Sequence, residues 1–176
     1  MISQGEMLSL VGRFQDLTDR HAVDDLMDLF DEDAQFQIVG YSNLVGKREV
    51  RKNFEYNAAV NTELRFINPV LYGDRVTCQL LERNDRLRAI GINELSYTSC
   101  VISLKEGRIQ KFIATIEEGA SRKIRERVQA FIAWIARQDP VEFSRLFTPE
   151  GDFRYSAENG RRAVPLMKEW WVSVQR

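Results

Sequence analysis

The sequence contains few of the residues that form metal centres, disulfide scaffolds or histidine-based catalytic sites. Its 176 residues include one histidine and two cysteines. Two cysteines are too few for a disulfide framework, and with a single histidine they do not form the usual zinc spacings. No glycine-rich loop has the spacing of a phosphate or dinucleotide site. The sequence therefore predicts a protein that uses no metal ion and no cofactor.

Long hydrophobic runs and an excess of one charge are also missing. No stretch approaches the roughly 18 consecutive apolar residues of a membrane span, and the N-terminus lacks the basic and apolar segments of an export signal. The formal net charge of −1 offers no field that would attract nucleic acid or an anionic membrane. The basic run at 122–127 favours a solvated helix face over a nucleic-acid contact. These features predict a cytoplasmic protein that binds neither nucleic acid nor membranes.

The first two thirds of the chain contain two kinds of segment, which differ in the spacing of their apolar residues. Apolar residues spaced three and four apart predict helices, whereas strict alternation predicts strands. The predicted elements are helices at 5–18, 24–30 and 46–58, a strand at 34–38, and strands at 64–71, 75–82, 95–104 and 108–117. Short turns at Gly73 and Gly107 join neighbouring strands, which favours an antiparallel meander. Asn84 and Asp85 are typical of a cap or a turn after the second of these strands.

A segment near the N-terminus is repeated near the C-terminus. Residues 11–36 align without a gap on residues 128–153. The identical pairs are Val11/Val128, Phe14/Phe131, Arg20/Arg137, Leu29/Leu146, Phe30/Phe147 and Phe36/Phe153. Internal similarity of this kind indicates one architectural unit that is used twice.

The second copy lacks the strand-rich stretch that follows the first. We therefore predict a complete domain at 1–119 and a truncated second copy at 120–176, with helix, helix, strand and helix. The apolar residues of this copy need a cover, which is either the first domain or a partner subunit. Trp170 and Trp171 suit an interface between subunits, so we expect a homodimer.

Three short motifs in a fixed order resemble one known superfamily. They are LFDEDAQF at 29–36, GKREV at 46–50 and LKEGRI at 104–109. With the predicted order of elements, they make the chain similar to the nuclear-transport-factor-2-like superfamily, the cystatin-like cone, which includes SnoaL-type polyketide cyclases and ketosteroid isomerase. The resemblance implies an α+β fold, with helices packed on a strongly curved antiparallel sheet around a pocket. Sheets of this superfamily often pair through their outer sides, which here would carry Arg75, Thr77, Gln79, Tyr97, Ser99 and Val101.

The resemblance does not select a reaction, because the superfamily includes isomerases, cyclases, dehydratases, epoxide hydrolases and non-catalytic modules. Where ketosteroid isomerase has its tyrosine and two aspartates, the matching positions here are Phe14, Ile38 and Cys100. Phenylalanine and isoleucine cannot transfer protons, so steroid-isomerase activity is not expected. An epoxide-hydrolase constellation would need Glu82 and Glu94 with Arg75 or Arg88.

Glu82 is the predicted acid/base residue. By strand alternation it shares a face with Val76, Cys78 and Leu80, and that face is the pocket side if those apolar residues are buried. A buried carboxyl has a raised pKa and suits proton transfer, whereas the alternative is an exposed carboxylate at the end of a strand. The predicted ligand-binding residues are Phe14, Tyr56, Asn57, Cys78, Asn84, Thr98, Cys100 and Phe112.

Two functional hypotheses follow. The first is a SnoaL-like protein that binds a small apolar molecule and acts as a cofactor-independent isomerase, cyclase or hydrolase. The second is a non-catalytic association or ligand-sensing module whose C-terminal half-repeat mediates dimerisation. A cavity with a buried acid favours the first hypothesis, and a filled cone with a broad apolar contact between subunits favours the second.

Overall fold

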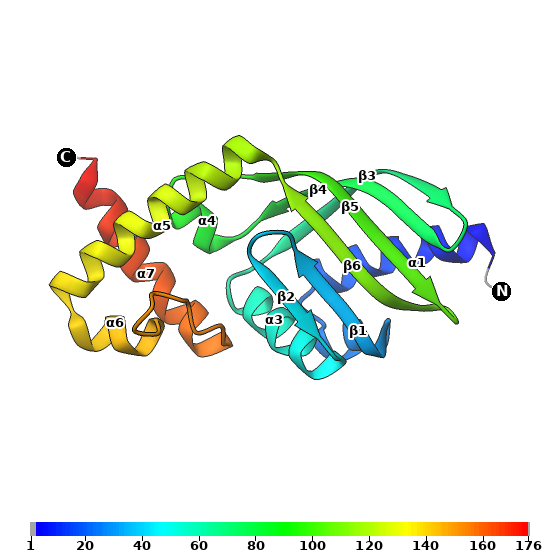
Figure 1. Cartoon of the computed structure of the whole chain (residues 1–176), viewed down its shortest axis with the longest axis horizontal. Helices are drawn as coiled ribbons and strands as arrows, with labels where there is room; N and C mark the ends of the chain where they lie inside the picture. The colour runs from blue at the N-terminus through cyan, green and yellow to red at the C-terminus, as the bar shows by residue number, and fades with distance from the viewer. Residues whose placement is uncertain (1–2, 176) are drawn as a thin grey trace.

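One curved sheet, with helices packed against it, accounts for the first two thirds of the chain (Figure 1). The computed structural model describes residues 3–175. The helices of this part are α1 (Gln4–Asp19), α2 (Val23–Met27), α3 (Lys47–Ala59) and α4 (Asp85–Ala89). The strands are β1 (Phe30–Ile38), β2 (Ser42–Val45), β3 (Glu63–Tyr72), β4 (Arg75–Arg83), β5 (Leu95–Lys105) and β6 (Arg108–Ile116). Their order in the sheet is β2-β1-β6-β5-β4-β3.

The predicted meander and fold class are confirmed. Strands β3 to β6 pair antiparallel with their neighbours in chain order, and β1 joins the other side of β6 in parallel. The sequence did not predict β2, a short strand that pairs with β1 at the edge of the sheet. The predicted second helix was too long, because it ends at Met27 and Phe30 already belongs to β1.

A β-bulge in β5 changes which of its residues face inward. Cys78 lies opposite Cys100, yet Leu80 lies opposite Tyr97, so β5 has one more residue than β4 over this interval. The pairing with β6 shifts at the same place, between Tyr97 and Ser99. Because an extra residue reverses the alternation beyond it, Tyr97 is buried with the inward side chains. The prediction that Tyr97 lies on the outer face of the sheet was therefore wrong.

The core beneath the helices is rich in phenylalanine. Helix α1 buries Met7, Leu10, Val11, Phe14 and Leu17 at helical spacing, and it packs on β3. The fully buried ring of Phe14 lies at the centre of this cluster. Its ring centroid is 5.6 Å from Phe30, 5.7 Å from Phe54, 5.3 Å from Phe66 and 5.6 Å from Phe112.

Three further helices follow the sheet and lie at the left end of Figure 1: α5 (Glu118–Gln138), α6 (Pro140–Leu146) and α7 (Ala157–Val174). Helix α5 begins directly after β6, so the secondary structure shows no break at the boundary predicted near Gly119. The strand predicted within the truncated copy is not formed. A single bridge between Phe147 and Phe153 takes its place, because no neighbouring strand is available to extend the pairing. The division into a domain and a truncated copy stays a prediction.

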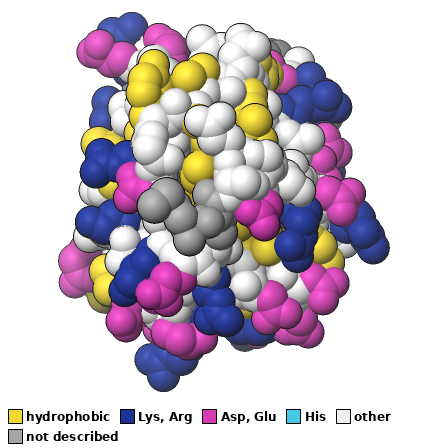
Figure 2. All heavy atoms as spheres, turned by 90° about the vertical axis from the view of Figure 1, so that its right-hand side faces the viewer, with side chains coloured by type: hydrophobic (Ala, Val, Ile, Leu, Met, Phe, Trp, Pro, Cys, Tyr) yellow, Lys and Arg dark blue, Asp and Glu magenta, His cyan; other side chains and the backbone are white. Residues whose placement is uncertain are grey.

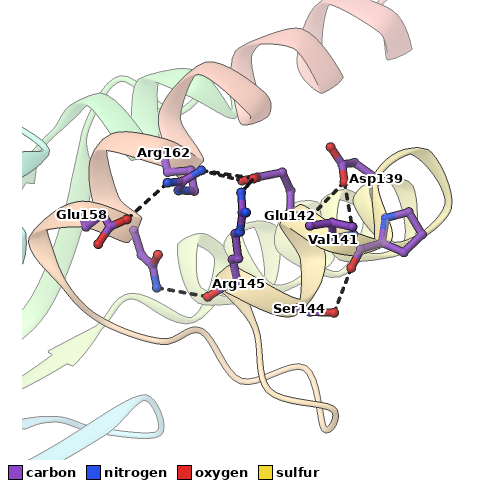
Figure 3. Close-up of polar contacts among 9 residues, drawn as sticks. Asp139, Val141, Glu142, Ser144, Arg145, Glu158 and Arg162 are labelled. Atoms are coloured by element: carbon purple, nitrogen blue, oxygen red, sulfur yellow. Dashed lines mark hydrogen bonds and ion pairs between the residues drawn. The ribbon is translucent and has the colours of Figure 1, made fainter.

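The C-terminal helices pack on the rest of the chain. Helix α7 contacts α3, α4, α5 and α6, and Phe131, Ile135, Leu146, Phe147 and Trp170 are buried. Ion pairs connect α6 to α7 (Figure 3): Glu142 Oε1 accepts hydrogen bonds from Arg145 at 2.6 Å and Arg162 at 3.1 Å, and Arg162 also donates to Glu158 at 3.2 Å. These residues do not line the cavity described below.

Charges of both signs are distributed over the surface. Figure 2 shows the end of the molecule at the right of Figure 1, where basic and acidic side chains are interspersed around the edge. Neither sign forms a continuous field on this face. Among residues 3–175, no helix combines the length and the apolar content that a membrane crossing requires.

Candidate functional site

A cavity of about 230 Å³ lies between the sheet and the helices that cover it. Its apolar walls include Phe36, Leu64, Leu80, Leu95, Phe112 and Ile116 from the sheet and Leu87 and Ile90 from α4 and its end. The polar groups on its walls include Tyr56 from α3, Glu82 from β4, Tyr97 from β5 and Arg86 from α4. A mostly apolar cavity with a few convergent polar groups has the general form of a small-molecule site.

Glu82 contributes a carboxyl group to the cavity, and Glu49, which also lines it, pairs with Lys52. The Tyr97 hydroxyl donates to Glu82 Oε2 at 2.5 Å, and Asn84 Nδ2 donates to Glu82 Oε1 at 2.6 Å. Burial raises the pKa of the Glu82 carboxyl above its ordinary value, and these two hydrogen bonds and the charge of Arg86 reduce the rise. Because burial disfavours the charged form, this group keeps its proton to a higher pH than a solvated glutamate.

The local sequence explains how the partners of Glu82 are held in place. Asn84 is the N-cap of α4, and its Oδ1 accepts from Leu87 N at 2.7 Å. The side-chain amide is therefore fixed by its oxygen, and its nitrogen points to the carboxyl. The β5 bulge turns Tyr97 inward, opposite Leu80 and two positions from Glu82 along β4. Burial, followed by the charge of Glu82, raises the pKa of Tyr97, so the phenol remains a donor.

Tyr56 presents a hydroxyl that makes no hydrogen bond. The side chain is 4% exposed, and its oxygen forms no well-aligned hydrogen bond with the described residues, although the Arg86 guanidinium lies near it. Burial raises the pKa of Tyr56 to about 12, although the charge of Arg86 opposes the rise. Buried hydroxyl groups nearly always have a partner, so this one is a candidate to bind a ligand atom.

The segment after the sheet completes the cavity. Ile124 and Val128 of α5 and Tyr155 from the segment before α7 contribute to its lining. The Tyr41 hydroxyl, in the turn between β1 and β2, lies 2.9 Å from both the carbonyl oxygen and Oγ of Ser121 in α5. The C-terminal part of the chain is thus attached at the rim of the cavity and contributes side chains to it.

Five of the nine predicted site residues line the cavity: Tyr56, Asn57, Glu82, Asn84 and Phe112. Their part in ligand binding stays a prediction. The other four do not line it. Phe14, Cys78 and Cys100 are buried in the core outside the cavity, and Thr98 is exposed. For Thr98 the reason is the bulge, which separates it from the inward face of Cys100. For the other three it is close packing by neighbouring side chains.

The epoxide-hydrolase constellation is not assembled from the residues that the sequence suggested. Glu94 pairs with Arg83 at 2.7 Å. Arg88 pairs with Asp85 at 3.0 Å, and Arg75 lies beside Asp74 in an exposed turn. None of these groups lines the cavity, so only Glu82 remains of that set. Within residues 3–175, no group of three or more His, Cys, Asp or Glu side chains is arranged to hold a metal ion.

Sequence reasoning missed Arg86, Tyr97 and Tyr155 as cavity residues. Arg86 lies in a run of charged residues, where the alternation of polar and apolar residues does not show which side chains point inward. The inward direction of Tyr97 depends on the bulge in β5. Tyr155 follows the isolated bridge, outside any regular element. The sequence contained one indication for Tyr155. Phe153 and Tyr155 are two residues apart, and this spacing places both aromatic side chains on one face of an extended segment.

Comparison with known proteins gives structural relatives only. No protein-family model matches the sequence, and no curated protein matches it. SalBIII, an epoxide hydrolase/cyclase-like enzyme in pyran ring formation of the polyether salinomycin, is similar with a TM-score of 0.60 and 17% identity, over 68% of this chain and 97% of that chain. An LEH-like epoxide hydrolase of M. tuberculosis has a TM-score of 0.58 and 15% identity, over 73% and 96%. AusH from Aspergillus nidulans has a TM-score of 0.55 and 18% identity, over 67% and 88%. At these identities the similarity confirms the expected fold and carries no activity to this chain.

Proposed function

Because the chain has the fold of the nuclear-transport-factor-2-like superfamily, we propose that it binds a small, mainly apolar molecule and moves a proton on it. The single observation that carries this proposal is the position of Glu82. Its carboxyl group lines an apolar cavity of about 230 Å³ and has a raised pKa. A carboxyl group with a raised pKa can act as a general acid while it holds its proton and as a base after it has lost it.

The size of the cavity limits the ligand. An apolar cavity of about 150 Å³ accommodates benzene, so a cavity of about 230 Å³ suits a molecule with one ring and short substituents. Glu82, Asn84 and Arg86, which are close in the sequence, all line the cavity. The reactive part of the ligand would bind at these groups, and its apolar body would contact Phe36 and Phe112.

The surroundings of Glu82 support proton transfer in both directions. When the carboxyl is ionised, the Tyr97 hydroxyl and the Asn84 amide donate hydrogen bonds to it and stabilise the charge. When it is protonated, one of its oxygens donates instead, toward a ligand atom in the cavity. Isomerisation, cyclisation and hydrolysis all require such transfers, and two structural relatives are described as an epoxide hydrolase/cyclase-like enzyme and an epoxide hydrolase.

The competing hypothesis of a non-catalytic association module has less support. It makes the C-terminal half-repeat the interaction element, but Phe131, Leu146, Phe147 and Trp170 of this segment are buried within this chain. A homodimer remains a proposal. Its candidate contact is the outer face of the sheet, with Arg75, Gln79 and Ser99 exposed.

Blocking the cavity should abolish ligand binding. Val128 is partly buried and lines the cavity from α5, so Val128→Phe adds a ring to the space that a ligand needs. We expect it to weaken the binding of neutral ring compounds, such as benzamide and cyclohexanone, by roughly 10-fold or more. Saturation-transfer NMR across a ligand titration measures this change.

Val141→Phe is the matched control, because Val141 is 62% exposed on α6 and lies outside the cavity lining. It introduces the same side chain and should leave the affinities unchanged. If both variants bind these compounds as the wild type does, or if the wild type binds none of them, the proposed function is wrong.

A further inference from the structure

Arg86 differs from the other arginines around α4 in having no acidic partner. Arg83 pairs with Glu94 and Arg88 pairs with Asp85. No carboxylate of the described residues lies within 4.0 Å of the Arg86 guanidinium, even though this side chain lines the cavity. A guanidinium that leaves water without a counter-charge is destabilising, and this one has no carboxylate partner among residues 3–175, so the cavity suits an anionic group of a ligand.

Glu82 does not neutralise this charge directly. No Glu82 oxygen lies within 4.0 Å of the guanidinium, and the two oxygens accept from other donors, Oε2 from the Tyr97 hydroxyl and Oε1 from the Asn84 amide. The Arg86 guanidinium instead lies over the Phe153 ring, 5.2 Å from its centroid, and its Nη1 is 3.4 Å from the Tyr155 hydroxyl. The aromatic rings hold the guanidinium in place, and its remaining N–H groups stay available as donors.

Two tyrosine hydroxyl groups accompany the arginine. Tyr56 and Tyr155 pack edge to face with ring centroids 5.0 Å apart. Within residues 3–175, the buried Tyr56 hydroxyl has no hydrogen-bond partner, and the Tyr155 hydroxyl accepts only the long contact from Arg86. A planar cation with two phenolic donors matches the two oxygens of a carboxylate, which accepts paired hydrogen bonds from arginine.

From this arrangement we infer that the ligand of the cavity is an apolar molecule with one carboxylate group, which binds to Arg86, Tyr56 and Tyr155. The inference rests on the proposed function and specifies its ligand class. Tyr155 is 50% exposed, so the carboxylate lies near the rim and the apolar body extends inward along the sheet. Because Tyr155 comes from the C-terminal segment, the ligand site is incomplete without that segment.

Matched pairs of probes test the inference: benzoate with benzamide, and phenylacetate with phenylacetamide. Each pair has the same body and differs in charge. We expect the wild type to bind each carboxylate roughly 10-fold or more tightly than its amide, since hydrogen bonds to a charged group are the stronger kind. Isothermal titration at low salt measures both affinities.

Arg86→Gln should remove this preference and retain the binding of the amides. Tyr56→Phe, a smaller change that does not depend on the fold tolerating the loss of Arg86, should reduce the preference several-fold. Arg83→Gln is the control, because Arg83 pairs with Glu94 outside the cavity, and it should keep the full preference. Acetate and inorganic phosphate should not displace benzoate, because they lack the apolar body.

The outcomes separate this inference from the proposal on which it rests. Equal binding of carboxylate and amide by the wild type, or a preference that survives Arg86→Gln, would overturn the carboxylate class and leave the proposed function standing. Displacement of benzoate by acetate or phosphate would overturn the apolar part of the class. Failure of all four probes to bind would contradict both proposals.

Discussion

Phe14→Ala should lower the free energy of unfolding by about 3–5 kcal/mol, the usual range for removing a fully buried phenylalanine ring. The ring is 0% exposed and is surrounded by four other phenylalanines. Its neighbours come from α3, β1, β3 and β6, so they cannot all move into the space that it leaves. Urea unfolding with linear extrapolation measures the change.

Leu8→Ala is the matched control for Phe14, because it shortens an apolar side chain on the same helix at a position that is 40% exposed. We expect a loss below about 1 kcal/mol for this variant. If Phe14 were a ligand contact, as the sequence suggested, its replacement would leave stability nearly unchanged and abolish binding. That combination would contradict the arrangement of the core.

Gly91→Ala should be the second most damaging change, with an expected loss of roughly 2–5 kcal/mol. Gly91 follows α4 with φ of +72°, and an added Cβ would lie 2.7 Å from Cε2 of Trp171. The left-handed conformation costs roughly 1–2 kcal/mol for other residues, and the overlap adds about 1–3 kcal/mol. Trp171 cannot move freely, because the Arg127 guanidinium lies 4.4 Å from its ring centroid and Arg127 donates to the Ile90 carbonyl oxygen.

Gly73→Ala separates the two contributions, because Gly73 has φ of +60° but no atom within 4 Å of an added Cβ. Gly73→Ala should lower the free energy of unfolding only by the cost of the left-handed backbone conformation, roughly 1–2 kcal/mol. The difference between the two variants measures the contact between α7 and the end of α4. Trp171→Ala in the Gly91→Ala background should recover most of that difference. Equal losses for Gly91→Ala and Gly73→Ala would contradict this packing of α7.

Most elements up to β6 were predictable because their hydrophobic periods are regular, but β2 and the short helix α4 were not. Phe14 and Leu17 of α1 and the alternating residues of β4 each follow a single period. The side-chain direction of Tyr97 was not predictable, because one extra residue in β5 reverses the alternation and leaves no mark in the sequence. Thr98 was wrongly predicted in the pocket and Tyr97 wrongly predicted outside it, and both errors result from this one bulge.

The candidate site was predictable only in part, for a related reason. Glu82 follows the alternation of β4, which is regular on its own, and the structure gives it the predicted inward position. Arg86 depends on the short helix that Asn84 caps, and Tyr155 depends on how an irregular segment packs on α3. Both positions are set by tertiary packing, which local periodicity does not encode.

We propose that the Glu82 carboxyl gains and loses a proton inside a ligand-sized cavity. The pKa of this carboxyl is raised by burial, so the folded protein holds the proton more tightly than the unfolded chain does. The resulting contribution to stability is complete below the ordinary pKa of glutamate and is lost as the pH rises through the pKa of the folded state.

A ¹³C NMR titration of protein labelled at the glutamate carboxyl carbons measures this group directly, and Glu82→Gln identifies its resonance. We expect the Glu82 carboxyl to titrate above the exposed glutamates Glu6, Glu117 and Glu150, whose pKa values are lowered by hydrogen bonds. Its resonance should also shift when benzamide binds. A Glu82 resonance that titrates among those of the exposed glutamates and does not respond to any bound ring compound would contradict the account.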